Sequence, residues 1–198
     1  TAVVALTKLV QVQKKEVVLI HAAAGGLGLA AVQLARHLGA RVFATAGSKD
    51  KCQIAEESGA ELAVSYRNPN WRSELMTATE GHGVDIVFDS VGGEVTKESI
   101  KCLAWQGRLL IVGFSSGNLP NLPAHLLLLK NASAIGVYWS HERNPKMLAD
   151  IGRQLVQLFE TGIIQPIIHN PYGFSDLPQA LQDLQNRVSV GKLVMRFD

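Results

Sequence analysis

The chain has 198 residues, of which 47% are hydrophobic, so it can bury one substantial core and we expect one domain. The 19 basic and 17 acidic residues leave a net charge of +2 and form no cluster, which argues against a nucleic-acid partner. No apolar run is long enough to cross a membrane, so we expect no membrane partner. Cys52 and Cys102 show no zinc-ligand spacing, so we expect no metal site and a reduced, cytoplasmic or mitochondrial setting.

Apolar residues at helical spacing predict an entering helix within residues 1–12, after which strands and helices alternate. Two of the helices end in a Gly-Ala step, at Gly39 and Gly59, where glycine can terminate a helix before a new strand. This alternation predicts an α/β fold: a doubly wound, parallel six-stranded Rossmann sheet of order 3-2-1-4-5-6 with helices on both faces. The predicted strands are 17–21, 41–45, 62–65, 84–89, 107–112 and 133–138, and the predicted helices are 26–38, 49–58, 71–79 and 94–103.

The remaining part of the chain is expected to close the same domain, so that residues 1–198 form one dinucleotide-binding unit. Its helices are predicted at 145–161 and 176–186, with an extended stretch at 165–169 and a last strand at 192–197. The stretch 115–124 contains two prolines and two asparagines and is predicted to be a loop at the wall of the binding site.

A glycine-rich turn follows the first predicted strand and leads directly into a helix. Residues 23–28 read Ala-Ala-Gly-Gly-Leu-Gly, which is the G-x-G-x-x-G fingerprint with alanine in the first position. Unpaired N–H groups at a helix N-terminus favour a pyrophosphate, and Gly25 lets the backbone approach it, while Gly28 lets the helix pack on the strand. The alternative is that these small residues serve only helix-to-sheet packing. Dinucleotide binding is the better interpretation.

The end of the second strand bears on which dinucleotide binds. NAD-preferring domains usually place an acidic residue there, but this chain continues with Gly47, Ser48 and Lys51, and Tyr66 follows the third strand. A positive charge and polar donors suit a 2′-phosphate, so the sequence favours NADP(H). Asp50 lies past the strand end, in the first turn of a helix. The alternative for the lysines is a solvated helix start.

Several phrases of the sequence resemble the medium-chain dehydrogenase/reductase superfamily, in its zeta-crystallin or NADPH:quinone oxidoreductase branch. They are HAAAGGLGLAAVQLAR at 21–36, GSKDKCQIAEESGAE at 47–61, SYRN at 65–68, DIVFDSVGG at 85–93 and the long block at 99–139 that contains AWQGRLLIVGF. The resemblance covers nearly the whole chain. In this family the cofactor domain is joined to a separate substrate lobe, so we expect residues 187–198 to include the strand that returns toward a lobe outside this chain.

The resemblance also implies roles for individual residues, all of them in cofactor binding. Aromatic residues at a sheet end can equally serve the core or an interface, and that alternative stays open for Phe114, Tyr138 and Trp139. The implied contacts are the phosphate turn (Ala24, Gly25, Gly26, Leu27), the 2′-phosphate pocket (Gly47, Ser48, Lys51, Tyr66), the nicotinamide half (Ser90, Val91, Gly113, Phe114, Ser115, Tyr138, Trp139) and a further arginine, Arg187.

The activity implied by the resemblance is zinc-independent hydride transfer from NADPH to a quinone or an α,β-unsaturated carbonyl. The cofactor carries that reaction, so we assign no catalytic residue, and without a substrate lobe we expect little turnover. Asp89 is expected to be a turn residue, and the six histidines are scattered. Two alternatives remain: an enoyl-reductase domain of a fatty acid or polyketide synthase, and a non-catalytic NADPH-binding interaction protein. An apolar strand at 133–138 predicts a homodimer.

Overall fold

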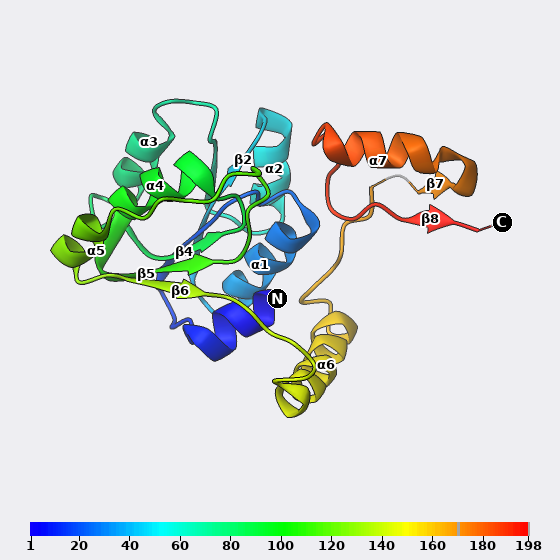
Figure 1. The fold of residues 1–198 in the computed structure, drawn as a ribbon, viewed down its shortest axis with the longest axis horizontal. Coiled ribbons are helices and arrows are strands. Elements are labelled where there is room, and N and C mark those ends of the chain that lie inside the picture. Colours follow the sequence, from blue (N-terminus) through cyan, green and yellow to red (C-terminus); the bar gives the residue numbers. More distant parts are fainter. Residues whose placement is uncertain (170, 198) are drawn as a thin grey trace.

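A computed structural model describes residues 1–169 and 171–197 and confirms the predicted fold. Six parallel strands form one sheet of order β3-β2-β1-β4-β5-β6 (Figure 1). The strands are β1 (Val17–Ile20), β2 (Arg41–Ala46), β3 (Leu62–Ser65), β4 (Val84–Asp89), β5 (Leu103–Ile111) and β6 (Ser133–Gly136). The helices around them are η1 (Val4–Leu9), α1 (Gly26–His37), α2 (Lys49–Glu57), α3 (Trp71–Ala78), α4 (Gly93–Cys102), α5 (Ala124–Lys130) and α6 (Pro145–Glu160).

Helices cover both faces of the sheet because successive side chains of each strand point to opposite sides. In β1, Val18 and Ile20 join a buried cluster with residues of η1, α1 and α6. Val17 and Leu19 join a second cluster with residues of α3 and α4. All four β1 residues are buried, as the uninterrupted apolar run predicts for a central parallel strand. The two clusters hold β1 rigidly, and with it the start of the glycine-rich turn.

Several elements differ from the sequence prediction, among them β6, which ends at Gly136 rather than at residue 138. Helix α5 was not predicted, and its four consecutive leucines leave it without a clear amphipathic period. Strand β5 begins at Leu103 rather than residue 107, because the strand pairs with Val84 before a register shift and resumes at Arg108. The entering helix is a π-helix that ends at Leu9, where the Val10 N–H donates to the Ala5 carbonyl oxygen. None of these changes moves the carboxyl ends of the central strands.

The last part of the chain adds a second, two-stranded sheet beside the main one (Figure 1). This part contains β7 (Tyr172–Gly173), η2 (Phe174–Asp176), α7 (Leu177–Gln185) and β8 (Met195–Arg196). Strands β7 and β8 pair in parallel, and Lys192 forms an isolated bridge with Ile168. The predicted last strand at 192–197 is therefore shorter in the structure and has partners inside the chain. Residue 198 of the predicted closing segment lies outside the described residues.

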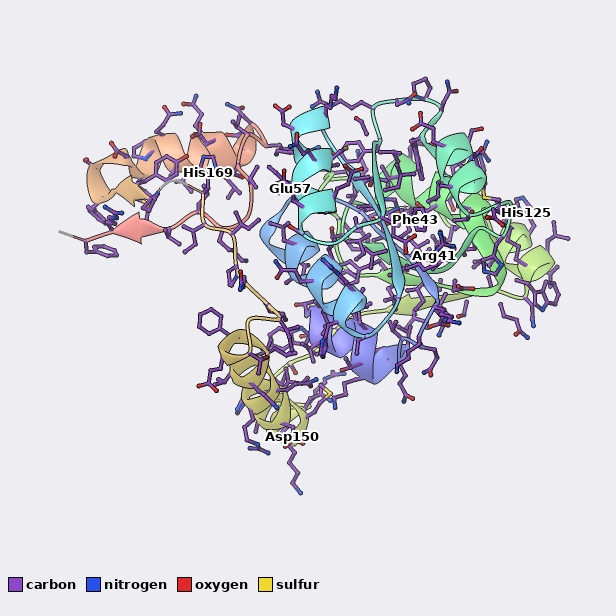
Figure 2. The ribbon with its side chains drawn as sticks, turned by 180° about the vertical axis from the view of Figure 1, so that it is seen from behind. Arg41, Phe43, Glu57, His125, Asp150 and His169 are labelled. Atoms are coloured by element: carbon purple, nitrogen blue, oxygen red, sulfur yellow. The ribbon has the colours of Figure 1, made fainter. Side chains whose placement is uncertain are left out.

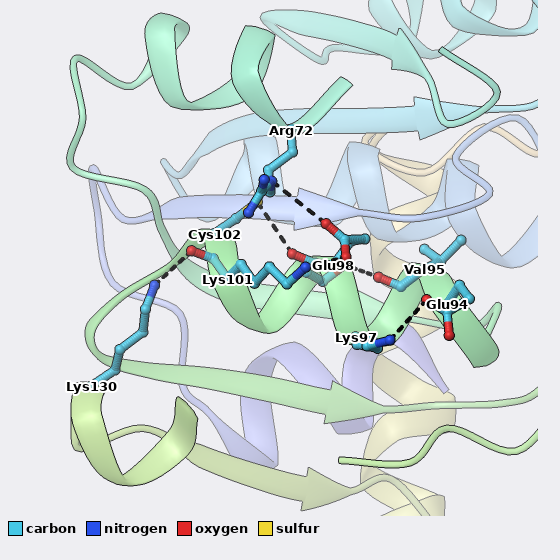
Figure 3. A network of polar contacts seen from close by, with 9 residues as sticks. Arg72, Glu94, Val95, Lys97, Glu98, Lys101, Cys102 and Lys130 are labelled. Atoms are coloured by element: carbon cyan, nitrogen blue, oxygen red, sulfur yellow. Dashed lines mark hydrogen bonds and ion pairs between the residues drawn. The ribbon is translucent and has the colours of Figure 1, made fainter. Parts of the chain in front are cut away.

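The outer helices α3, α4 and α5 are joined by a polar network (Figure 3). Glu98 on α4 accepts ion pairs from Arg72 on α3, at 3.6 Å, and from Lys101 one turn further along α4. The ammonium group of Lys130 on α5 donates to the carbonyl oxygen of Lys101 at 2.7 Å. Cys102 lies beneath this layer, and burial raises the pKa of its thiol to about 12. This cysteine is therefore a core residue rather than a nucleophile.

Candidate dinucleotide site

The glycine-rich turn leaves main-chain N–H groups free at the start of α1. Ala22 adopts a left-handed conformation with φ of 51°, and its carbonyl oxygen accepts the N–H of Gly25 at 3.0 Å. Within the part of the chain that the structure describes, the N–H groups of Ala24 and Leu27 donate to no protein acceptor. No acidic residue lies in the first turn of α1. The turn and the positive end of the helix dipole therefore favour an anion.

Close backbone contacts explain the glycines of the turn. A β-carbon at Gly28 would lie 2.3 Å from the Ala22 carbonyl oxygen, which is a severe clash with main chain. A β-carbon at Gly26 would lie 3.1 Å from the carbonyl oxygen of Gly191, in the C-terminal segment. Gly28 therefore permits α1 to pack on the turn, as the fingerprint predicts, and Gly26 permits the C-terminal segment to pass beside it.

A cavity of about 460 Å³ opens at the carboxyl ends of the central strands, next to this turn. Its position is the point where the strand order reverses, which is where open α/β sheets bind their ligands. Half of the sixteen predicted cofactor residues line it. The lining consists of Ala22, Ala24, Gly25, Ala46, Gly47, Lys51, Tyr66, Val91, Ser115, Leu184, Gln185, Arg187 and Ser189.

At the end of β2 the cavity is shaped by Gly47 and Tyr66. A β-carbon at Gly47 would lie 2.9 Å from the Tyr66 hydroxyl oxygen, so only glycine leaves the phenol in this position. Ser48 is the N-cap of α2, and its hydroxyl oxygen accepts the N–H of Lys51 at 3.3 Å. Ser48 does not line the cavity. Its observed role is to start the helix that carries Lys51.

The ammonium group of Lys51 lies between α2 and the C-terminal segment. It donates to the carbonyl oxygens of Arg187 at 2.6 Å and Ser189 at 2.8 Å. An ammonium group has three donors, so one remains for a ligand in the cavity. Burial lowers the pKa of Lys51, and the nearby Arg67 guanidinium lowers it further. A phosphate at this position would relieve that repulsion between like charges.

Arg187 reaches the cavity from the end of α7. It adopts a left-handed conformation with φ of 56°. The Arg187 N–H donates to the carbonyl oxygen of Leu184, and the Val188 N–H donates to the carbonyl oxygen of Asp183. This is the arrangement that usually ends a helix with glycine. The Arg187 guanidinium donates to the carbonyl oxygen of Ser115 at 3.1 Å. The C-terminal segment then returns to the glycine turn, where the Gly191 N–H donates to the Ala24 carbonyl oxygen at 2.8 Å.

The other predicted residues lie around the cavity or away from it. Ser90 and Gly113 are neighbours after β4 and β5, and Phe114 packs against Gly92. Tyr138 is 76% exposed, and the Trp139 indole N–H donates to the Thr1 hydroxyl at 3.2 Å. Neither aromatic residue lines the cavity. Their predicted contact with the nicotinamide half stays a prediction.

Five lining residues were not predicted from the sequence. Ala22 and Ala46 are small residues within two positions of the predicted residues Ala24 and Gly47. Leu184, Gln185 and Ser189 come from a helix and a segment far along the chain. No local pattern distinguishes these three, because only the return of the C-terminal segment brings them to the sheet.

Asp89 is the buried last residue of β4 and shapes the loop that follows. Its carboxylate accepts the N–H groups of Val91 at 2.8 Å and Gly92 at 3.0 Å, and also the Thr96 hydroxyl. All of these contacts are local. The predicted role as a turn residue agrees with this geometry.

The histidines do not gather at the cavity. His125 on α5 and His169 before β7 lie at opposite ends of the molecule (Figure 2). Across residues 1–169 and 171–197, no three His, Cys, Asp or Glu side chains are placed to hold a metal ion. None of the helices in the described residues combines the length and the apolar character needed to cross a bilayer.

The sheet order, the glycine turn and the cavity at the switch point define a dinucleotide-binding domain of the doubly wound class. Comparison with known families identifies it further: residues 26–153 match the family model described as zinc-binding dehydrogenase, and the chain belongs to this family. The family name includes zinc, but the described residues offer no ligand set for it.

Relatives with curated descriptions agree with this assignment. The chain is 38% identical over 199 residues to the quinone oxidoreductase-like protein 2 homolog of Nematostella vectensis, covering 98% of this chain and 54% of that protein. It is 34% identical over 208 residues to the highly reducing polyketide synthase ZEA2 of Gibberella zeae, covering 100% of this chain and 9% of that protein. The resemblance to the quinone oxidoreductase branch is thereby confirmed. The chain spans about half the length of the quinone oxidoreductase-like relative.

A solved structure has the same fold over nearly the whole chain. It is the quinone oxidoreductase of Escherichia coli complexed with NADPH, with a TM-score of 0.86 and 30% identity, covering 98% of this chain and 61% of that chain. The fold and the family are therefore established.

Proposed function

We propose that this chain binds NADPH as the cofactor domain of an oxidoreductase that delivers hydride to quinones or other α,β-unsaturated carbonyls. One observation carries the proposal: free N–H groups of the glycine turn, the Lys51 ammonium and the Arg187 guanidinium meet at one cavity. In this arrangement the positive end of a helix can bind a pyrophosphate, and a cationic side chain can bind a further phosphate group. The NADPH-bound relative of the same fold supports it.

The preference for NADPH over NADH rests on the end of β2. The cavity wall there consists of Ala46, Gly47, Lys51 and Tyr66, none of which is acidic. A carboxylate at this place would bond the ribose 2′-hydroxyl of NADH and repel the 2′-phosphate of NADPH. Asp50 is exposed and is not part of the wall. The charge balance at this end of the cavity therefore favours the phosphorylated cofactor.

The chemistry that NADPH supplies is a hydride on its nicotinamide ring. The chain's own residues would bind and orient the cofactor: Gly25 and its neighbours at the pyrophosphate, Lys51 at the 2′-phosphate, and Val91 and Ser115 toward the nicotinamide half. No side chain of the described residues is assigned to proton transfer. We propose that a substrate lobe, outside this chain, completes the site and excludes water from it.

Calorimetric titration of the chain with NADPH and NADH tests the cofactor assignment. We expect NADPH to bind at least about tenfold more tightly, because a charge-assisted hydrogen bond contributes roughly 1.5–3 kcal/mol. Lys51→Gln should remove most of that difference, because it should lower the affinity for NADPH and leave the affinity for NADH unchanged. Lys49→Gln is the matched control, since Lys49 is exposed at the start of the same helix and does not line the cavity. Equal affinities of the wild type for both cofactors would refute the preference.

A second candidate is an enoyl reductase within a multidomain synthase, favoured by the 34% identity to a polyketide synthase. The two candidates differ in substrate: a free quinone against an enoyl group carried on a thioester. Assaying the full-length protein with a soluble quinone and with an enoyl thioester of N-acetylcysteamine separates them. Cofactor binding with neither activity would instead support the non-catalytic interaction protein.

We also propose that the chain forms a homodimer through β6. This strand lies at one edge of the six-stranded sheet, and Ser133, Ala134 and Gly136 are exposed along it. An unpaired edge next to apolar side chains favours pairing with a second copy. Sedimentation at micromolar concentration tests this, and a replacement of Ala134 by proline should shift the equilibrium to monomer. A wild-type monomer would refute the proposal.

A further inference from the structure

One buried side chain below the cavity has no part in the function proposed above. His21 is the residue between β1 and the glycine turn, and it is completely buried. Its Nδ1 lies 2.7 Å from the Thr45 hydroxyl oxygen on β2, and its Nε2 lies 2.6 Å from the Ser99 hydroxyl oxygen on α4. Its ring is nearly perpendicular to that of Trp71 on α3, with 5.8 Å between ring centroids. One imidazole thus contacts three neighbouring elements.

The hydrogen-bond network fixes which nitrogen of His21 holds the proton. The Ser99 hydroxyl donates its only hydrogen to the Val95 carbonyl oxygen at 2.6 Å, so it must accept from Nε2–H. Nδ1 is then the acceptor of the Thr45 hydroxyl. The opposite tautomer would leave the Thr45 hydrogen without an acceptor among the described side chains. Burial lowers the pKa of His21, against the opposing effect of the Asp89 carboxylate, and keeps the ring neutral.

Thr45 connects this network directly to the turn. Its hydroxyl contacts His21, and its carbonyl oxygen accepts the N–H of Ala23 at 3.0 Å. The His21 N–H donates to the Phe88 carbonyl oxygen on β4 at 3.1 Å. The first residues of the turn are therefore held from β2 and from β4 at once. Ala22, between them, keeps its left-handed conformation only while both neighbours are fixed.

We propose that His21, as the neutral Nε2–H tautomer, is a positioning residue that aims the N–H groups of the glycine turn at the cofactor pyrophosphate. The inference rests on the proposed function. His21 itself does not line the cavity and touches no ligand there. It acts through Thr45 and the main chain of the turn. Loss of this network should therefore weaken ligands that use the turn and spare those that bind only at the end of β2.

The test compares two ligands on matched variants of Thr45. Thr45→Val keeps the shape of the side chain but removes the donor to Nδ1, while Thr45→Ser retains the hydroxyl. We expect Thr45→Val to raise the dissociation constant of NADP⁺ about tenfold. The dissociation constant of 2′-AMP, which lacks the pyrophosphate, should rise less than twofold in the same variant. Thr45→Ser should bind both ligands about as tightly as the wild type. Unchanged NADP⁺ affinity of folded Thr45→Val, or an equal loss for both ligands, would overturn the inference.

A second measurement on the wild type is independent of folding of the variants. Nitrogen-15 NMR of the histidine rings should show His21 as the neutral Nε2–H tautomer at pH 7, both with and without NADP⁺. A protonated Nδ1 would overturn the inference. Failure of the wild type to bind NADP⁺ at all would instead refute the proposed function, so the two failures are distinguishable.

Discussion

The left-handed conformation of Arg187 predicts that a glycine and an alanine variant at this position differ in stability but not in cofactor binding. A non-glycine residue with φ near 56° is strained by about 1–2 kcal/mol, and glycine avoids this strain at an entropic cost of about 0.5–1 kcal/mol. Arg187→Gly should therefore be about 1 kcal/mol more stable than Arg187→Ala, since both lack the guanidinium and its bond to Ser115. For a domain of this size that is roughly 2–4 °C in Tm.

Both substitutions should lower the affinity for NADPH by a similar factor. The guanidinium is exposed at the cavity and makes one weak bond, so its charge is available to a phosphate. Losing a charge-assisted hydrogen bond costs about 1.5–3 kcal/mol, which is roughly a 10- to 150-fold rise in Kd. Thermal unfolding and calorimetric titration of the three proteins provide the data. Equal stability of the glycine and alanine variants would refute the backbone argument, and unchanged NADPH affinity in both would refute the contact with cofactor.

Three further predictions follow from single contacts. Gly47→Ala places a β-carbon 2.9 Å from the Tyr66 hydroxyl oxygen and should displace the phenol, weakening NADPH more than NADH in paired titrations; equal losses would contradict this role for Tyr66. The pKa of His21 is lowered in the folded chain, so on acidification the imidazole takes up a proton in the unfolded chain before it does so in the folded chain. The free energy of unfolding should therefore fall as the pH drops below 6.5. The contribution of this group is at most about 1.4 kcal/mol per pH unit. Denaturant titrations from pH 7.5 to 5 measure that slope, and His21→Gln should lack this part of it. The thiol of Cys102, with a pKa of about 12, should react with iodoacetamide at pH 8 only after denaturant is added; rapid labelling of the folded chain would contradict its burial.

The fold could be predicted from the sequence because its signals are local and repeated. The apolar run at Val17–Ile20, the turn ending at Gly28 and the helix exits at Gly39 and Gly59 each occupy a few consecutive residues. Parallel connections then permit few strand orders, so the sheet topology follows. Helix α5 was missed for the opposite reason. Its run of leucines has no period, and its packing depends on β5 and α4.

The residues of the candidate site also divide into those that local sequence signals predict and those that they do not. The turn residues and those at the end of β2 were predicted because both lie at strand ends that the topology brings together. Leu184, Gln185 and Ser189 were not, since their place depends on contacts between segments far apart in the chain, such as Lys51 with Ser189. The His21 network is also non-local: Thr45 and Ser99 are 24 and 78 residues away in sequence. A strand-end histidine alone does not reveal such partners.

The cavity separates two properties of cofactor binding that are often treated as one. Main-chain N–H groups of the turn, fixed by the buried contacts of His21 and Thr45, can serve any dinucleotide, because NADPH and NADH share the pyrophosphate. In the function proposed above, the choice between them falls to side chains at the end of β2, where Lys51 keeps one donor free. Lys51 also donates to the main chain of Arg187 and Ser189, so this one side chain links α2 to the C-terminal segment. We therefore expect substitutions at Lys51 to change the ratio of the NADPH and NADH affinities, whereas those at Thr45 should lower the affinity for both cofactors and leave their ratio intact.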